Sequence, residues 1–168
     1  MKTTLEKLFL RFTGYTYSNL SRLFMRLFVG IMFLQFGVRH LVNFDIMSAS
    51  FPAVMGMSSQ TSLIVMILIE TVCSLFIMAG FLTRLATIPP IISMIVAEYY
   101  IIHDLMPGID MAMLTSTMPG YLPLMFIGIY CYILMAGPGK ISADYLITIY
   151  IMERQGHDLS DSTELQEA

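Results

Sequence analysis

The feature that most constrains the fold is an apolar run at residues 62–82, SLIVMILIETVCSLFIMAGFL. About 20 mostly apolar residues are enough for a helix to cross the hydrocarbon core of a bilayer. One acid, Glu70, lies near the middle of this run. A carboxyl group at membrane depth is costly and usually faces a partner or a cavity. The run therefore predicts a membrane-spanning helix whose single acid needs an explanation.

The composition indicates the same solvent for the rest of the chain. Of the 168 residues, 57% are hydrophobic and only 12% are charged, whereas a soluble domain carries about 25% charged residues. So few charges cannot cover a water-facing surface, so the lipid bilayer is the expected main partner. The cations are spread over termini and turns, which favours lipid head groups and excludes nucleic acid.

Four apolar segments are candidate spans: residues 20–41, 62–82, 85–102 and 120–136. The second and third are nearly continuous, so they should form a tight hairpin, with Pro89 and Pro90 in the opening turns of the third. The sequence therefore predicts an all-α, polytopic membrane protein with a four-transmembrane-helix bundle over residues 20–136.

Three flanking segments complete the predicted organisation. Residues 1–19 combine apolar positions at helical spacing with cations, which is typical of an interfacial amphipathic helix. Residues 137–155 begin with the turn Gly-Pro-Gly-Lys and resume as a short apolar helix, which we interpret as a cytoplasmic docking or interfacial helix. Residues 156–168 are acidic and polar, which predicts a disordered tail.

The distribution of cations predicts the orientation, because cytoplasmic loops carry an excess of lysine and arginine. With four crossings, all cations but Arg39 fall on one side, so both termini are expected in the cytoplasm. The cations on that side are Lys2, Lys7, Arg11, Arg22, Arg26, Arg84, Lys140 and Arg154.

Three of the predicted spans bring polar side chains to one level. With a helical rise of about 1.5 Å per residue, four of these groups lie within roughly 4–12 Å of the outer membrane boundary. They are Gln35, Arg39, Glu70 and Glu98, and His40 and His103 lie at the boundary itself. In one interpretation Arg39 and Glu70 form a buried ion pair that fixes the helix register. In a second, the groups line a polar pocket that binds a small ligand, such as a quinone head group, or relays protons. In a third, they extend separately to the interface.

Metals and cysteine chemistry are weaker hypotheses. The predicted outer loops contain Met55-x-Met57 and Met111-x-Met113, and thioethers suit Cu(I). Methionine is equally plentiful within the spans, however, which favours a role in apolar packing. His40 and His103 are the candidate haem ligands, but no attachment motif supports haem. Cys73 and Cys131 fall at similar predicted depths, as packing residues or as a redox pair. We therefore predict no metal site and treat copper and haem as disfavoured cofactors.

Several of these residues resemble the DoxX family of small bacterial and archaeal membrane proteins. The first span, Gly30-x-x-Phe33-x-x-x-Gly37-x-x-His40-Leu41, is similar to the family's opening helix, which often has lysine at the position of His40. Glu70 followed by the residues GFLTRLA at 80–86 is the closest local match, and the residues GPGKISAD at 137–144 resemble the closing motif.

The resemblance implies a bundle of four membrane helices in a bacterial or archaeal cytoplasmic membrane. It also implies a link to respiratory redox chemistry, because the family name comes from a subunit associated with quinone reduction by thiosulfate or with quinol oxidation. An arginine neighbour, Arg39, is available where His40 replaces the family's lysine.

Two function classes follow. The leading hypothesis is a membrane subunit of a quinone-linked redox system. Such a subunit is expected to associate with a soluble or membrane redox partner subunit, or with further copies of itself. Its ligand-binding or proton-relay residues are Gln35, Arg39, His40, Glu70 and Glu98. The alternative is a non-enzymatic scaffold with a structural Arg39–Glu70 pair, whose last helix docks a partner. A solute or proton pathway is a third class, although the chain has no evident inverted repeat.

Overall fold

The computed structural model describes residues 18–99 and 121–155, and every regular element in that part of the chain is helical. The all-helical class expected from the sequence is therefore confirmed for these residues. The amphipathic segment up to residue 17, the loop at 100–120 with His103, Met111 and Met113, and the tail at 156–168 lie outside the described residues.

Within residues 18–99 and 121–155, two helices are long and apolar enough to cross a membrane. The first is α2, Ser18–Val42, with a mean hydropathy of 1.4 over an 18-residue window, and the short helix α3, Phe44–Met47, follows it. The second covers Ser59–Ala79, with a mean hydropathy of 2.4 over an 18-residue window. It consists of α4 (Ser59–Leu68), the π-helical turn η2 (Ile69–Cys73) and α5 (Ser74–Ala79).

The remaining apolar helices are shorter. Helix α6, Thr83–Ala86, continues into α7, Ile88–Ala97, whose first turn contains the two prolines, where their missing N–H groups cost nothing. Helix α8 is Tyr121–Ala136. Both α7 and α8 adjoin residues 100–120. Length and hydropathy thus support two crossings among the described residues, and the four-crossing topology stays a prediction.

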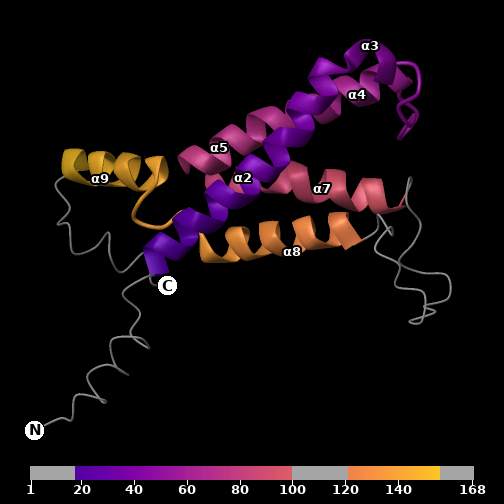
Figure 1. The fold of residues 1–168 in the computed structure, drawn as a ribbon. Helices are drawn as coiled ribbons and strands as arrows, with labels where there is room; N and C mark the ends of the chain where they lie inside the picture. The colour runs from indigo at the N-terminus through magenta and orange to yellow at the C-terminus, as the bar shows by residue number, and fades with distance from the viewer. Residues whose placement is uncertain (1–17, 100–120, 156–168) are drawn as a thin grey trace, which may run out of the picture.

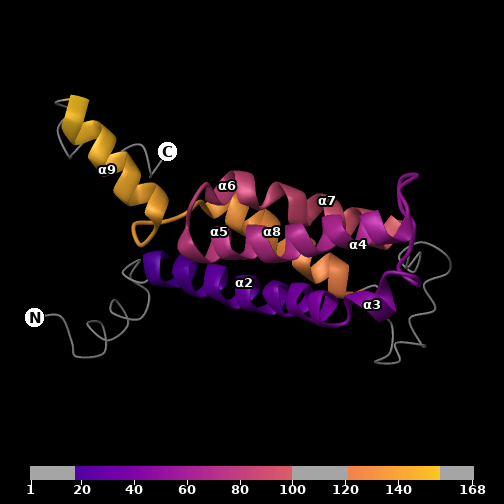
Figure 2. The same ribbon diagram turned by 90° about the horizontal axis from the view of Figure 1, so that it is seen from above.

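These helices lie side by side as one elongated bundle (Figures 1 and 2). Helix α2 packs along α4, η2 and α5 on one side and against α8 on another, while α7 packs against α8. The core is formed by side chains from α2, α5, α6, α7 and α8, with aromatic rings at its centre. Its buried members are Val29, Phe33, Ile77, Ala86, Met94, Phe126, Tyr130 and Ile133.

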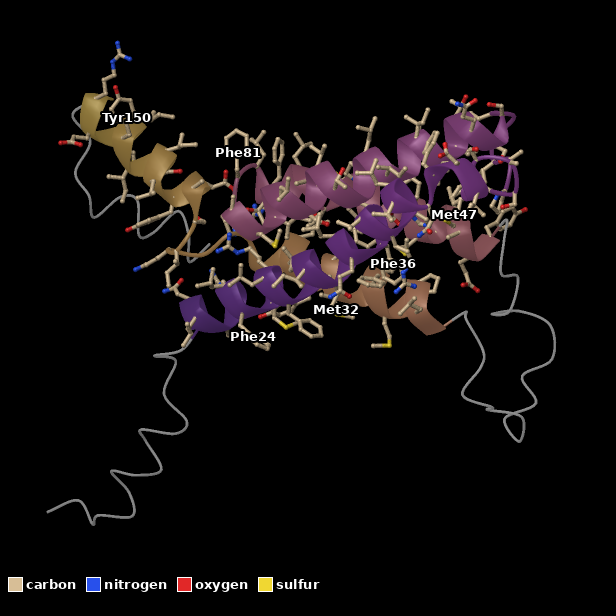
Figure 3. The ribbon with its side chains drawn as sticks, turned by 45° about the horizontal axis from the view of Figure 1, so that its top comes forward. Phe24, Met32, Phe36, Met47, Phe81 and Tyr150 are labelled. Atoms are coloured by element: carbon tan, nitrogen blue, oxygen red, sulfur yellow. The ribbon has the colours of Figure 1, made fainter. Side chains whose placement is uncertain are left out.

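The outward faces of the bundle are apolar as well. Phe24 of α2 is 63% exposed, and Met125 and Met135 of α8 are 61% and 81% exposed. Phe24 and Met32 lie along the outer side of α2 in Figure 3. Extended apolar surface of this kind is unfavourable in water and favourable in lipid. The outer surface therefore agrees with the membrane location indicated by the composition.

The two motif segments at 80–86 and 137–144 meet at one end of the bundle. Asp144 accepts hydrogen bonds from the N–H groups of Leu82 (2.6 Å) and Thr83 (2.9 Å) and from the Thr83 hydroxyl (2.9 Å). Gly80 has φ 72° at the end of α5, a left-handed conformation that glycine adopts without strain. Asp144 thus links the α5–α6 turn to the start of α9, Ala143–Gln155, which extends away from the bundle (Figure 2).

Candidate functional site within the helix bundle

Glu70 lies on the only π-helical turn inside the second apolar helix, among its described residues. The residue is 1% exposed. A π turn replaces the usual backbone hydrogen bonds with longer i→i+5 spacing, and such single turns are frequent at functional sites. Here the Thr71 hydroxyl donates to the carbonyl oxygen of Ile67 at 2.6 Å, which satisfies one backbone group of the distorted segment. The helix is therefore irregular at the acid itself.

The partner of Glu70 is His40, near the end of α2. The distance between His40 Nδ1 and Glu70 Oε2 is 2.6 Å, and their side chains are 15% and 2% exposed. The imidazole also lies edge-on against the ring of Phe51, at 5.7 Å between ring centroids. A short contact between a histidine and a buried carboxylate is a charge-assisted hydrogen bond when the ring is protonated. The pair therefore joins α2 to η2 and can hold a proton between two side chains.

Gly37 allows α2 to come this close to η2. A Cβ atom at this position would be 2.8 Å from Cγ2 of Thr71 and 3.0 Å from Cβ of Glu70. Small residues permit close approach of helix backbones in membranes. Gly37 and His40 are three residues apart and so lie on the same face of α2. The glycine therefore positions the histidine opposite the acid.

Tyr130 of α8 adds a buried hydroxyl to this region. The residue is 0% exposed and its ring packs edge-on against Phe33, with 5.5 Å between centroids. Its hydroxyl has no hydrogen-bond partner among the described residues, and neither does the buried hydroxyl of Ser74. Glu70 and Cys73 are close enough to interact electrostatically with the Tyr130 hydroxyl. Buried hydroxyl groups are normally paired, so an unpaired one near the acid is available to a ligand or a water molecule.

The arrangement corrects the Arg39–Glu70 pair expected from the sequence. Arg39 is exposed and its guanidinium lies over the ring of Phe36, 5.9 Å from the centroid. Gln35 is also exposed, and both residues line an open, mostly apolar groove of about 440 Å³ on the outer side of α2. Adjacent helical residues point about 100° apart, because one turn takes 3.6 residues. Residue 40 therefore faces Glu70, whereas residue 39 does not.

Glu98 directly follows α7. Both of its carboxylate oxygens are buried and lack a hydrogen-bond partner within the described segments. No described contact joins it to the His40–Glu70 pair. Of the five residues singled out in the sequence, the structure brings together His40 and Glu70, places Gln35 and Arg39 on a separate outer groove, and leaves Glu98 apart.

Tyr130 and Thr71 were not among the residues predicted from the sequence. Each is one of several hydroxyl-bearing residues within a strongly apolar helix, and such a residue is as often a packing residue as a functional one. The position of Tyr130 within the fourth apolar segment indicates its depth in the membrane, but depth does not fix the direction of the side chain.

The structure describes only some of the candidate redox and metal residues, because His103, Met111 and Met113 lie outside the described segments. Cys73 and Cys131 are both free and half-buried. Over residues 18–99 and 121–155, no three histidine, cysteine, aspartate or glutamate side chains converge as a metal site would require. Met55 of the candidate copper pair is 70% exposed.

Comparison with known proteins supports the motif resemblance. The family model described as DoxX matches residues 21–104, which are half of the 168 residues. The match includes α2 with His40, the π turn with Glu70 and the α5–α6 turn. Neither the curated proteins nor the solved structures gave a match. With half of its length matched, including both members of the buried pair, the chain belongs to the DoxX family.

Proposed function

We propose that this DoxX-family protein is an integral membrane subunit of a quinone-linked redox system. The His40–Glu70 pair is the proposed place where a quinone head group is bound or exchanges protons. One observation carries the proposal: a histidine and a carboxylate lie 2.6 Å apart in a mostly apolar helix bundle. Ionisable residues at membrane depth commonly mark a substrate or proton pathway.

The side chains suit a quinone head group in their hydrogen-bonding capacity. Nδ1 of His40 contacts Glu70, so the second ring nitrogen, Nε2, is left for a ligand. His40 is also the more exposed member of the pair, so a ligand would approach it first. The unpaired Tyr130 hydroxyl is a further donor or acceptor nearby. An apolar isoprenoid tail would find a matching surface on the exposed apolar helix faces.

Reduction of a quinone to a quinol consumes two electrons and two protons. In this proposal both side chains are protonated at the start. His40 passes one proton to a quinone oxygen, Glu70 reprotonates the imidazole, and His40 then passes this second proton to the other quinone oxygen. The electrons come from a redox-active partner subunit, because the sequence contains no recognisable motif for a redox cofactor of its own. Protein association is therefore part of the proposed function.

The proposed topology has four crossings of a bacterial or archaeal cytoplasmic membrane, with both termini in the cytoplasm. Arg22 and Arg84 line one pocket together with Gly139, at the end of the bundle where α9 begins. His40 and Arg39 lie at the far end of α2. A concentration of cations at one end supports the cytoplasmic assignment of that end.

Quinone binding to two matched variants tests the proposal. Glu70→Gln removes the carboxylate with little change in shape, while Arg39→Gln removes a neighbouring charge outside the pair. For purified protein in nanodiscs, the expected result is that Glu70→Gln weakens binding of ubiquinone and menaquinone about tenfold or more, a loss of about 1.4 kcal/mol or more. Arg39→Gln should retain the wild-type affinity. Equal quinone affinity of wild-type and Glu70→Gln protein would contradict the proposal.

A non-enzymatic scaffold is the second candidate, and the last helix favours it. One side of α9 carries Leu146, Ile147, Tyr150 and Ile151, all more than 40% exposed. Residues four apart lie on one helical face, so these side chains form an apolar surface able to dock a partner protein or the bilayer. In this alternative the His40–Glu70 pair only holds α2 to η2. Glu70→Gln would then lower thermal stability in detergent, and the wild-type protein would bind no quinone.

A further inference from the structure

A second pocket, with two arginines among its lining residues, lies at the opposite end of the bundle from His40. It has a volume of about 560 Å³ and is enclosed by the α5–α6 turn, the start of α9 and the loop after α8. Phe81, which marks this end in Figure 3, is one of its lining residues. The pocket is built largely from the segments 80–86 and 137–144, which Asp144 holds together.

Two arginines from different helices converge on this pocket. Arg22 comes from α2 and Arg84 from α6, and both lie against the Gly137-Pro138-Gly139 turn. A Cβ atom at Gly137 would be 3.4 Å from Nη2 of Arg84, and one at Gly139 would be 3.2 Å from Cδ of Arg22. Both glycines have positive φ, 71° and 76°, so the turn both requires glycine and leaves room for the arginines.

The positive charge of these arginines is not neutralised by an ion pair. Within the described part of the chain, the one side-chain ion pair is His40–Glu70, and no described hydrogen bond involves either guanidinium. Asp144 is the carboxylate that lines the pocket, but Oδ1 accepts from Leu82 and Oδ2 accepts twice from Thr83. Its oxygens are therefore already engaged by the turn, while the guanidinium donors remain available.

Behind the pocket lies a third arginine, Arg26, which is 1% exposed. One of its nitrogens donates to the carbonyl oxygen of Ile141, and Nε and Nη1 have no partner among the described residues. Asp144 interacts electrostatically with this guanidinium. The buried cation thus offsets the charge of Asp144, and the net charge around the pocket is positive.

Apolar surface continues outward from the same pocket. Leu85, 62% exposed, and Ile147, 42% exposed, both line it. A free anion would need only the charged part, whereas a lipid needs a charged site for its head group and an apolar surface for its chains. Basic pockets of this kind on the cytoplasmic side of membrane helices bind anionic lipid head groups.

From these contacts we propose that the pocket binds the phosphate group of an anionic phospholipid in the adjacent leaflet. Arg22 and Arg84 hold the phosphate oxygens, because the planar guanidinium fork matches phosphate geometry. The acyl chains lie against Leu85 and the neighbouring apolar faces. A bound lipid would therefore stabilise the junction of α2, α6, α8 and α9.

Native mass spectrometry of the full chain with added lipid tests this proposal. Wild-type protein should bind phosphatidylglycerol more tightly than phosphatidylcholine, which carries the same phosphate but no net charge. The double variant Arg22→Gln/Arg84→Gln should weaken phosphatidylglycerol binding about tenfold or more, as expected for loss of charged hydrogen bonds. Arg154→Gln, which removes an exposed cation of α9 outside the pocket, should change the affinity by less than about twofold.

The controls make each outcome decisive. If the double variant does not fold, Arg84→Gln alone applies, because the Arg84 side chain is exposed and makes no described hydrogen bond. An equal loss in the Arg154→Gln variant, or no preference for phosphatidylglycerol, would overturn the proposal. Inorganic phosphate should not displace the lipid at equal concentration. Full displacement would show that the pocket serves free phosphate and would also overturn it. The result is independent of quinone binding.

Discussion

At the scale of single residues, the most consequential small residue is Gly37. It brings the backbone of α2 against η2 at the turn that carries Glu70, and it places His40 within hydrogen-bonding distance of the acid. The neighbours that an added methyl group would meet are Cβ of Glu70 and a methyl group of Thr71, on a segment packed on both sides. There is little freedom for these atoms to move away.

Gly37→Ala should therefore destabilise the protein and lengthen the contact between His40 and Glu70. The expected cost is about 1–3 kcal/mol of unfolding free energy, the usual range for overpacking a tight interface. Thermal or denaturant unfolding in a fixed detergent measures it. Gly128→Ala in α8 is the matched control, because a Cβ atom there has nothing within 4 Å, so its stability should stay within about 0.5 kcal/mol of wild type. Equal stability of the two variants would refute this account of Gly37.

The residue scale also shows how far the sequence could predict the site. An acid inside an apolar run is identifiable because burial of a carboxylate is costly, and Glu70 is indeed buried. Its partner was expected to be Arg39 from depth alone. The depth of a residue along a helix does not fix the direction of its side chain around the helix axis. Whether Arg39 or His40 is the partner of Glu70 therefore depends on how α2 packs against η2, which the sequence alone does not specify.

At the scale of elements, the apolar runs predict helices because each run must satisfy its backbone groups internally. The hairpin between the second and third runs is also predictable, and α5 and α6 are separated only by residues 80–82. The π turn η2 is not predictable, because its residues have no pattern that distinguishes them from an α-helix. The convergence of the segments 80–86 and 137–144 is not predictable either, because it depends on long-range hydrogen bonds to Asp144.

At the scale of the whole molecule, the proposed function depends on the orientation of the bundle across the membrane. The arginine pocket and the His40–Glu70 pair lie toward opposite ends, so one should face the cytoplasm and the other the outer side. In the proposed function, this separation would let a partner subunit or a lipid act at one end while the pair exchanges protons near the other.

Single cysteines introduced after replacement of Cys73 and Cys131 test this orientation in intact cells. A membrane-impermeant thiol reagent should label Ser50→Cys, in the segment after α3, without permeabilisation. It should label Arg154→Cys, in the last turn of α9, only after the membrane is permeabilised. Both positions become accessible in opened cells, which controls for reactivity. Labelling of both cysteines from the same side would contradict four crossings with cytoplasmic termini or the placement of α3.

The most direct test of the central claim is the position at which a photoreactive quinone analogue attaches to the protein in its membrane. Crosslinks are expected on the end of α2 around His40 and on residues 69–73 of η2. Excess natural quinone and the Glu70→Gln substitution should each abolish them, while Arg39→Gln should leave them intact. Crosslinks confined to the outer groove around Gln35 and Arg39, or unchanged by Glu70→Gln, would contradict the claim that the buried His40–Glu70 pair binds the quinone.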